Sequence, residues 1–441
     1  MNKKYLPFFD QAKKLGIIES EITFQKSRAT SIDIFHSEVS SFSISDSQDL
    51  VARGVLNNHF GAAHTEKVDK ANIINLADQI AVNASLNEND DPAIIFKGSK
   101  KYRKKNIYNP EVDSVSVDDK IKLLLDIEKR LKSADKRVSE VSSVSYEETY
   151  SEFVLMNSYG LDLSSKSNYF YIYAEVVVKS GDEVKTGYKI FLNNSFKDFN
   201  IDQFVNDVVN DATRKLGGKP IPSGKYKTVI NPKVTSSLLS FYMRSAVAEN
   251  IQKHTSLFEG KLGEQIASKK VTINEEPLKN NIFYTYFDAE GVATSNKSFV
   301  EKGVLKTYAY NLSTAAKDNV ETTGNAGGGG SKIGTTYVNL VLKPGRLSEQ
   351  ELFEKTQNGF YLTEVQGLHA GLNPTSGNFS LQASGFVIRD GKMAEPVSLI
   401  TVAGNLLDIF KDVVAVGNNL ELQTSSTSAP SILIKKLAVA G

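Results

Sequence analysis

The sequence contains no cysteine among its 441 residues. This absence excludes disulfide bonds, thiolate zinc sites and a cysteine nucleophile. It fits a reducing compartment, so we expect a cytoplasmic protein. There is also no apolar run of the about 18 residues that mark a candidate membrane helix. The basic first segment, Met1–Gly16, is interrupted by Asp10, so we expect neither a signal peptide nor contact with a membrane.

The sequence lacks an excess of either charge. Lysine and arginine number 52, and aspartate and glutamate number 51. Because no net field results, neither nucleic acid nor an anionic membrane is a favoured partner. One basic run, Lys97–Asn106, includes the aromatic Tyr102, a combination that can hold single-stranded nucleic acid. A single short run in a neutral protein is more typical of a solvated loop.

Histidine is scarce, with five residues, and the spacings HExxH and HExxxH do not occur. The helical zinc motif with two histidines is therefore missing. His59 and His64 flank a predicted turn and could approach each other, but without a third ligand they are more typical of a surface hairpin. The acidic pairs Asp118–Asp119, Glu147–Glu148 and Glu275–Glu276 are interpreted as solvated surface rather than as acid/base groups.

The apolar pattern predicts an α+β fold with two domains. Residues 1–216 are expected to form a domain of helices and antiparallel sheet, and residues 217–441 a β-rich domain. The boundary is placed at Gly217–Tyr226, where Gly, Pro and Ser cluster after a helix stop. Asn57-Asn58 predicts a hairpin turn. Alternation predicts strands with one buried face at Ile22/Phe24, Ile32/Ile34 and Phe42/Ile44, and helical spacing predicts helices near residues 6–15, 71–84, 117–131, 201–212 and 232–253.

Four consecutive glycines, Gly327, Gly328, Gly329 and Gly330, lie in the stretch TTGNAGGGGSKIGTTYVNL. The stretch is not a phosphate-binding P-loop, because its order is Gly-Ser-Lys and the next residues favour a strand over a helix. A nucleophile elbow fails as well, because the second glycine of G-x-S-x-G comes one residue late. Two interpretations remain open: a flexible connector, or a loop whose backbone approaches a bound peptide closely.

Three C-terminal segments carry a resemblance to a known family. They are SLFEGKLGEQIASKKVTI at residues 256–273, FDAEGVATSNKSFVEKGVLKTYAYNLSTAAKDNVETTGNA at 287–326, and GLHAGLNPTSGNFSLQASGFVIRDGKMAEPVSLITVAGNLLDIF at 367–410. Together they resemble the TldD/PmbA family, whose members have been described as modulators of DNA gyrase and as zinc-dependent peptidases. The closing APSILIKKLAVAG resembles the PmbA (TldE) branch. The resemblance extends over nearly the whole chain.

The resemblance implies two kinds of subunit. The TldD-type subunit carries HExxxH on a helix just before the GEQIAS-like segment, with a cysteine near the C-terminus as third ligand. Counting back from Ser256 places Leu239, Ser240 and Arg244 at the HExxxH positions. Leucine has no lone pair, serine is no comparable base, and arginine stays cationic. We therefore expect no catalytic residue, metal or cofactor in this chain, with zinc in a partner subunit.

The implied role is that of a non-catalytic subunit. Such a chain would shape a chamber that binds extended, unfolded peptide through main-chain hydrogen bonds, for cleavage by a TldD-type zinc subunit. Candidate substrate or interface residues are Gly327–Gly330, His369, Asn373 and Ser380. An equally open alternative is that Asn373 only makes a turn, and Asn405 is interpreted as a helix cap or turn residue.

Other functions stay open as alternatives. One is a regulator associated with gyrase or nucleic acid, against which the neutral charge argues. Another is an independent metallopeptidase whose ligands are not recognised in the sequence. A third is a homodimer without catalysis, because a second copy of the chain could satisfy a family-type interface.

Overall fold

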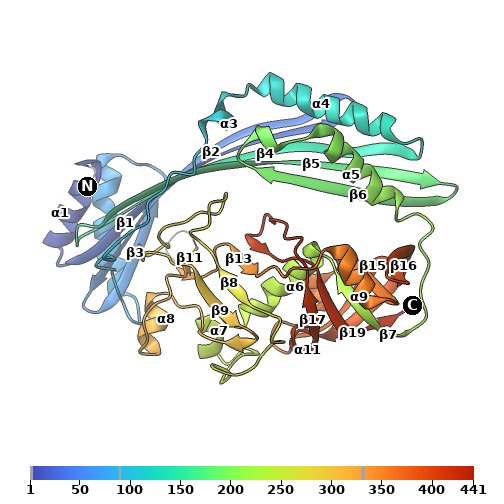
Figure 1. Cartoon of the computed structure of the whole chain (residues 1–441). Coiled ribbons are helices and arrows are strands. Elements are labelled where there is room, and N and C mark those ends of the chain that lie inside the picture. The colour runs from blue at the N-terminus through green and yellow to red at the C-terminus, as the bar shows by residue number, and fades with distance from the viewer. Residues whose placement is uncertain (1–2, 89–90, 329–332) are drawn as a thin grey trace.

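The computed structural model describes residues 3–88, 91–328 and 333–441. Figure 1 shows a long sheet, built by the N-terminal half, that arches over a β-rich C-terminal half. The arrangement confirms the predicted α+β class, with an antiparallel sheet first and a β-rich region after it. The expected division into domains at residues 216 and 217 stays a prediction.

The N-terminal sheet consists of long antiparallel strands. Their bounds are β1 Glu19–Phe35, β2 Glu38–Leu56, β3 His59–Thr65, β4 Val138–Asn157, β5 Asp162–Ser180 and β6 Glu183–Asn193. They lie side by side in the order β3-β2-β1-β4-β5-β6. The predicted turn between β2 and β3 is confirmed. Asn57 and Asn58 have left-handed φ angles of 51° and 68°, and a type I′ hairpin turn requires positive φ at both central residues.

Helices cover this sheet at two places. Their bounds are η1 Lys3–Tyr5, α1 Leu6–Lys14, α2 Lys70–Ser85, α3 Pro110–Ser114, α4 Val117–Ala134, η2 Phe196–Asp198 and α5 Ile201–Thr213. In Figure 1, α4 lies on the side of the sheet that faces away from the C-terminal half, and α1 packs at the opposite end. Ser116 and Asn200 cap the starts of α4 and α5, since the side chain of each accepts a backbone N–H from the residue three positions on. Across the described residues, no helix has the length and apolar character of a membrane span.

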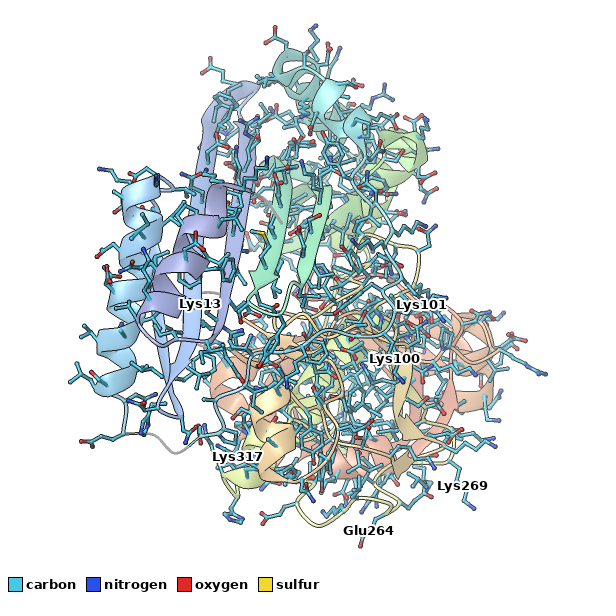
Figure 2. All side chains as sticks on the ribbon, turned by 90° about the vertical axis from the view of Figure 1, so that its left-hand side faces the viewer. Lys13, Lys100, Lys101, Glu264, Lys269 and Lys317 are labelled. Carbon is cyan, nitrogen blue, oxygen red and sulfur yellow. The ribbon has the colours of Figure 1, made fainter. Side chains whose placement is uncertain are left out.

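The basic run Lys97–Asn106 lies in an irregular segment that runs along the C-terminal half. The hydroxyl of Tyr102 donates a hydrogen bond to the carbonyl of Gly291 at 2.7 Å, and its ring meets the ring of Tyr286 edge-on. Exposed lysines, including Lys100, lie beside it on the surface in Figure 2. Because the aromatic ring is engaged in packing between the two halves, it does not offer a free surface for stacking a base.

The C-terminal half is built around a ring of strands. Strand bounds are β7 Gly224–Ile230, β8 Ile273–Glu275, β9 Lys297–Glu301, β10 Val304–Leu305, β11 Ala326–Gly327, β12 Gly334–Thr335, β13 Leu340–Leu342, β14 Gly359–Gln366, β15 Asn378–Arg389, β16 Lys392–Asn405, β17 Val413–Val416, β18 Thr427–Ser428 and β19 Ile432–Ala440. The larger sheet has the order β16-β15-β14-β7-β19-β17, and β16 also pairs with β19, which closes the ring. A second sheet, β10-β9-β8-β13-β18, lies beside it.

The predicted single helix over residues 232–253 is wrong, because the chain forms two helices there. The helices of this half are α6 Pro232–Arg244, α7 Ala248–Gln252, α8 Leu312–Lys317, α9 Glu349–Thr356, α10 Leu368–Gly371 and α11 Leu406–Lys411. Between α6 and α7, Ala309 donates to the Ala246 carbonyl at 2.7 Å and accepts from the Ala248 N–H at 3.0 Å. This exchange with a distant segment replaces the helical hydrogen bonds and ends α6.

The expectation that Phe42 and Ile44 lie on the buried face of their strand is also wrong. Their side chains are 48% and 53% exposed. At this point β2 lies at the edge of the sheet, because β3 pairs with it only from Leu50 onward. Ile32 and Ile34 of the neighbouring β1 are buried as predicted. The alternating pattern therefore identified the strand but not its place in the sheet.

Candidate functional site

The C-terminal end of α6 carries the positions at which the resemblance places HExxxH. Leu239 is fully buried in the core, whereas Ser240 and Arg244 line a surface groove. Residues four apart share one face of a helix, so Ser240 and Arg244 point in the same direction. The hydroxyl of Ser240 and the guanidinium of Arg244 therefore face the groove, whereas Leu239 faces the core.

The groove has a volume of about 410 Å³. Helices α6 and α7 form one wall, the segment between β12 and β13 forms another, and the residues around the start of β18 form the third. Most of its side chains carry a hydroxyl or an amide: Ser240, Asn250, Thr335, Thr336, Tyr337, Ser425, Ser426 and Thr427. Such groups both donate and accept hydrogen bonds, so the groove suits a polar ligand.

Arg244 brings a positive charge to this groove. Its side chain is exposed, and the guanidinium lies 5.9 Å from the centre of the Phe241 ring. Among the described residues, no acidic side chain forms an ion pair with it. A guanidinium without an internal partner is suited to bind a carboxylate or carbonyl oxygen of a ligand.

Glu249 of α7 lies behind the groove wall. Its Oε1 accepts hydrogen bonds from the Thr335 hydroxyl at 2.8 Å and from the Asn311 amide at 3.2 Å. Its Oε2 is buried and has no hydrogen-bond partner among the described residues. Glu249 therefore fixes the position of Thr335 in the groove lining and keeps one acceptor unused.

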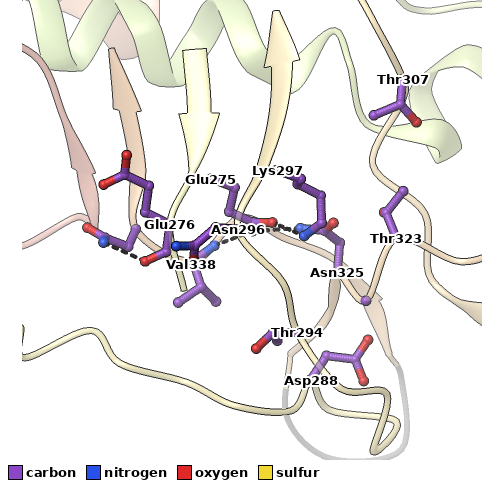
Figure 3. Close-up of polar contacts among 12 residues, drawn as sticks. Glu275, Glu276, Asp288, Thr294, Asn296, Lys297, Thr307, Thr323, Asn325 and Val338 are labelled. Carbon is purple, nitrogen blue, oxygen red and sulfur yellow. Dashed lines mark hydrogen bonds and ion pairs between the residues drawn. The ribbon is translucent and has the colours of Figure 1, made fainter. Parts of the chain in front are cut away.

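A buried ion pair anchors the chain beside the groove. Glu275 is 1% exposed, and its Oε2 accepts from Lys297 at 2.5 Å. As Figure 3 shows, its Oε1 also accepts from the side chain of Asn325 at 2.7 Å and from the backbone N–H of Val338 at 2.8 Å. Burial raises the pKa of Glu275, and the charge of Lys297 opposes that rise. In the sequence, Asn325 precedes the four glycines and Val338 follows them. Glu275 therefore holds the chain on both sides of the glycines.

Two more carboxylates are buried nearby, and one of them, Asp288, supports the start of the same stretch. Asp288 accepts backbone N–H bonds from Glu290, Val292 and Ala326. Burial raises the pKa of Asp288 to about 7, although these N–H groups lower it. Burial and the charge of Asp288 raise the pKa of Glu290 to about 8, and Glu290 accepts the Leu312 N–H. Deprotonation of this pair near neutral pH would place charge on two largely buried side chains.

The interpretation of the acidic pairs as solvated surface is wrong for two of them. Asp118 and Asp119 are exposed at the start of α4, as expected. Glu275 is buried, and so is Glu148, which accepts hydrogen bonds from Lys120 at 2.5 Å and from Tyr146 at 2.6 Å. The lysine partners of the two glutamates are 22 and 28 residues away in the sequence, so no local pattern reveals these ion pairs.

The glycine-rich stretch leaves the groove wall as a short hairpin. Gly327 of β11 pairs with Gly334 of β12, and a Cβ added to Gly327 would lie 2.0 Å from the side chain of Thr336 in the groove lining. Gly328 has a φ of 105°, a conformation that side chains rarely adopt. Gly329 and Gly330 lie outside the described residues. The stretch thus begins at the groove, and its contact with a ligand stays a prediction.

The three polar candidates of the later block lie on the surface and not in the groove lining. His369 is on α10, Asn373 follows it, and Ser380 is on β15, all exposed. Asn373 makes a turn, since its side chain accepts the N–H groups of Thr375 and Ser376 at 2.9 Å. Asn405 caps α11, which confirms its interpretation. A role for His369 and Ser380 in a subunit contact stays a prediction.

The described residues bring together no group of three His, Cys, Asp or Glu side chains that could hold a metal ion. The idea that His59 and His64 approach each other is wrong. Both lie on β3, five residues apart, and an odd separation places side chains on opposite faces of a strand. His64 instead lies 3.3 Å from Asp49. At the end of α6, Leu239, Ser240 and Arg244 do not fit a zinc ion.

Comparison with known proteins gives concordant matches. Residues 110–216 match the PmbA/TldA metallopeptidase central domain, and residues 223–441 match the PmbA/TldA metallopeptidase C-terminal domain. A metalloprotease of Methanothermobacter thermautotrophicus is 32% identical over 291 residues, which are 64% of this chain and 63% of that protein. The chain thus spans just under two thirds of this relative.

Two further matches cover more of the chain. Metalloprotease PmbA of Escherichia coli O157:H7 is 26% identical over 329 residues, 74% of this chain and 71% of that protein. A solved structure from Thermotoga maritima, described as a candidate modulator of a DNA gyrase, has a TM-score of 0.93 and 31% identity, with 99% of each chain covered. The likeness includes both the arched sheet and the groove-bearing half.

Proposed function

Because the chain belongs to the PmbA/TldD metallopeptidase family, we propose that it is the non-catalytic subunit of a peptidase complex. It binds an extended, unfolded peptide and presents it to a zinc-bearing, TldD-type partner. The partner's zinc supplies the chemistry of water activation when that subunit is present. This chain contributes shape and hydrogen bonds, and it acts in the cytoplasm.

The observation that carries the proposal is the composition of the groove at the end of α6. A hydroxyl, Ser240, and a cation, Arg244, occupy the groove-facing positions of the helix, and Leu239 lies in the core. Arg244 repels a metal cation and attracts the oxygens of a peptide. These groups support the proposal that the site binds peptide, and their chemistry does not suit a metal ion.

The lining also suits a ligand whose sequence varies. Hydroxyl and amide groups of Asn250, Thr335, Thr336 and Thr427 can pair with peptide N–H and C=O groups, which are the same in every sequence. Such contacts require a substrate whose backbone is free of its own secondary structure. We therefore infer that the ligands are unfolded or already fragmented chains.

Peptide binding by the chain alone tests this proposal. In Arg244→Ala, affinity for a fluorescently labelled unfolded peptide should fall about tenfold or more, because a hydrogen bond to a charged group contributes about 1.5–3 kcal/mol. Lys269→Ala is the matched control, since Lys269 is an exposed cation outside the groove (Figure 2). Equal affinities for the two variants in fluorescence anisotropy would contradict binding in this groove.

The names of the relatives favour two other functions. The Escherichia coli relative is called a metalloprotease, so an independent peptidase is the second candidate. Stoichiometric zinc in the purified chain would support it. The Thermotoga maritima description favours a gyrase-associated regulator. Salt-dependent retention on DNA would support that role, which the balanced charge of the chain disfavours.

A further inference from the structure

A basic segment, Lys97–Asn106, runs along the surface of the C-terminal half. Six of its ten residues are cations, and none is acidic. The six cations are Lys97, Lys100, Lys101, Arg103, Lys104 and Lys105, and all of them are exposed. Figure 2 shows Lys100 and Lys101 at the surface of the molecule. Among the residues that the structure describes, none of the six forms an ion pair, so their charges are not neutralised within the chain.

The basic segment is irregular, but hydrogen bonds to the C-terminal half fix it in place. The Ser99 hydroxyl accepts the Ala293 N–H at 3.0 Å, and the Arg103 carbonyl accepts the Tyr284 hydroxyl at 2.5 Å. A ligand therefore meets a backbone that is already ordered, which lowers the entropy cost of binding. Within the described chain, the backbone N–H groups of residues 100–106 donate no hydrogen bond, so they are available to a ligand.

An amide-lined cleft of about 450 Å³ continues from the end of the basic segment, where the N-terminal half meets the C-terminal half. Six asparagines line it: Asn106, Asn109, Asn193, Asn194, Asn280 and Asn281. No charged side chain is among the described residues of this lining. The ammonium group of Lys105 donates to Oδ1 of Asn280, so a positive charge lies at the mouth of the cleft.

The amides of the cleft keep unused hydrogen-bonding groups. Asn106 and Asn280 each use the side-chain oxygen, and their NH₂ groups donate to no described residue. Asn194 uses its NH₂ group on the carbonyl of Ile107 at 3.0 Å, and its side-chain oxygen accepts from no described residue. Two donors and one acceptor match the C=O and N–H groups of a peptide backbone, which are the same in every sequence.

We propose that the basic segment and the amide-lined cleft together bind an acidic stretch of an unfolded peptide. The amides pair with its main chain, and the cations lie against its aspartate and glutamate side chains. Opposite charges speed association and select against basic chains. The inference rests on the proposed function in that the ligand is an unfolded peptide, and it adds the class of peptide and a second place where the peptide is held.

Single-stranded nucleic acid is a less favourable ligand for this surface. A basic strip holds such a strand when aromatic rings stack on successive bases. The ring of Tyr102 packs against Tyr286, and the ring of Tyr108 packs edge-on against Tyr150 at 5.8 Å between ring centres. The hydroxyl of Tyr108 also donates to Asp113. Both tyrosines are therefore engaged within the protein, whereas the amides suit a peptide backbone.

Fluorescence anisotropy with two labelled unfolded peptides, one rich in glutamate and one uncharged, tests the proposal on the full chain. The triple variant Lys100→Gln, Lys101→Gln, Lys104→Gln should bind the glutamate-rich peptide about tenfold more weakly, because three exposed ion pairs are lost. Its affinity for the uncharged peptide should not change. The three side chains make no hydrogen bond, ion pair or ring contact within the described chain, so the fold is retained.

The matched control for this variant removes three exposed lysines elsewhere, Lys13→Gln, Lys14→Gln and Lys269→Gln. Because its net charge is the same, it separates the position of the cations from their number, and it should keep the affinity for the glutamate-rich peptide. Raising the salt concentration from about 0.1 M to about 1 M should abolish the preference of the unmodified chain for that peptide, since screening shortens to about 3 Å.

A second variant tests the cleft itself. Asn106→Asp keeps the oxygen that accepts the Tyr108 N–H and replaces an unused NH₂ group by a negative charge. Affinity for the glutamate-rich peptide should therefore fall several-fold. Asn358→Asp is the control, because Asn358 is exposed and its oxygen likewise accepts a backbone N–H, from Asp390 at 3.4 Å. Equal affinities of these two variants would show that the cleft takes no part in binding.

The outcomes separate this inference from the proposed groove. Equal affinity of the unmodified chain for the two peptides, or an equal loss in both triple variants, would overturn the inference and leave binding in the groove intact. Tighter binding of a single-stranded oligonucleotide of the same charge, lost in the variant at residues 100, 101 and 104, would also overturn it. A preference for the acidic peptide that persists in Arg244→Ala would support it even where the groove fails its own test.

Discussion

The layer of α4 and α5 on the N-terminal sheet and the chain around the groove are stabilised in different ways. Under the helices, the core is mostly apolar, with Phe170, Ile172 and Leu124 fully buried, and one buried ion pair, Lys120 with Glu148, joins α4 to β4. Beside the groove, the buried groups include Glu275, Asp288 and other carboxylates, which are held by N–H groups and a lysine. Apolar packing adapts to many shapes, whereas a satisfied polar network holds one arrangement.

The comparison bears on the proposed peptide-binding function. The sheet is held mainly by long regular strands and apolar alternation, its helices supply cover, and its buried ion pairs, Arg53–Glu21 and Lys120–Glu148, are few. One wall of the groove depends on the position of the short β11–β12 hairpin, which contains glycine and threonine residues. No long strand pairs with this hairpin among the described residues. Buried hydrogen bonds from Glu275 and Asp288 provide that support. We expect substitutions in the two regions to separate stability from peptide binding.

The largest effect is expected for Glu275→Ala. Removal of the carboxylate leaves the largely covered Lys297 without its ion-pair partner and takes one of two acceptors from the buried Asn325. Loss of one member of a buried pair costs about 3–5 kcal/mol. Unfolding by urea should show this loss, and peptide binding should weaken because the glycine-rich stretch is released. The neighbouring Glu276→Ala is the control, and Glu276 pairs with a half-exposed Lys279. A control as destabilised as Glu275→Ala would contradict the special role of Glu275.

A smaller effect is expected for Gly327→Ala. The added Cβ would lie 2.0 Å from the side chain of Thr336, so the groove wall must shift, and such overpacking costs about 1–3 kcal/mol. Peptide affinity should fall together with stability. Gly334→Ala is the matched control, because a Cβ there meets nothing within 4 Å. Unchanged affinity in Gly327→Ala would show that the hairpin does not shape the binding site.

The apolar layer should respond in stability alone. Phe170→Leu removes part of a buried ring that stacks on Phe196 at 4.1 Å, with an expected cost of about 1–2 kcal/mol. Peptide affinity, measured well below the unfolding midpoint, should stay the same. Weaker binding in this variant would break the proposed separation between the sheet and the groove.

A pH dependence should arise from the groove side. Burial raises the pKa of Glu290 to about 8, so the folded state retains a proton that the unfolded chain loses near pH 4–5. Stability is therefore full below that range and falls as the pH rises to about 8, by at most about 1.4 kcal/mol per pH unit for one proton. Glu290→Gln should flatten the curve of unfolding free energy against pH, whereas the exposed Glu321→Gln should not.

Local signals were predictable from the sequence, and long-range ones were not. Ser116, Asn200 and Asn405 cap helices through bonds to residues two or three positions away, and Asn57-Asn58 turns a hairpin by its own backbone preference. These features need no knowledge of the rest of the fold.

The features that sequence reasoning missed depend on distant partners. The break after α6 requires Ala309, and the burial of Glu275 requires Lys297 and Asn325. The exposure of Phe42 follows from where β3 stops pairing. For the groove, the resemblance identified the positions on α6. It did not predict that Leu239 faces the core, or that Glu249 and Thr335 form a hydrogen bond beside the groove.

The central claim is that this chain binds peptide but holds no catalytic metal. The most direct test is zinc content by elemental analysis, together with cleavage of an unfolded peptide, for the chain alone and mixed with the TldD-type subunit from the same cell. The account predicts no zinc and no cleavage for the chain alone, with cleavage in the mixture. Stoichiometric zinc and chelator-sensitive cleavage by the chain alone would contradict it.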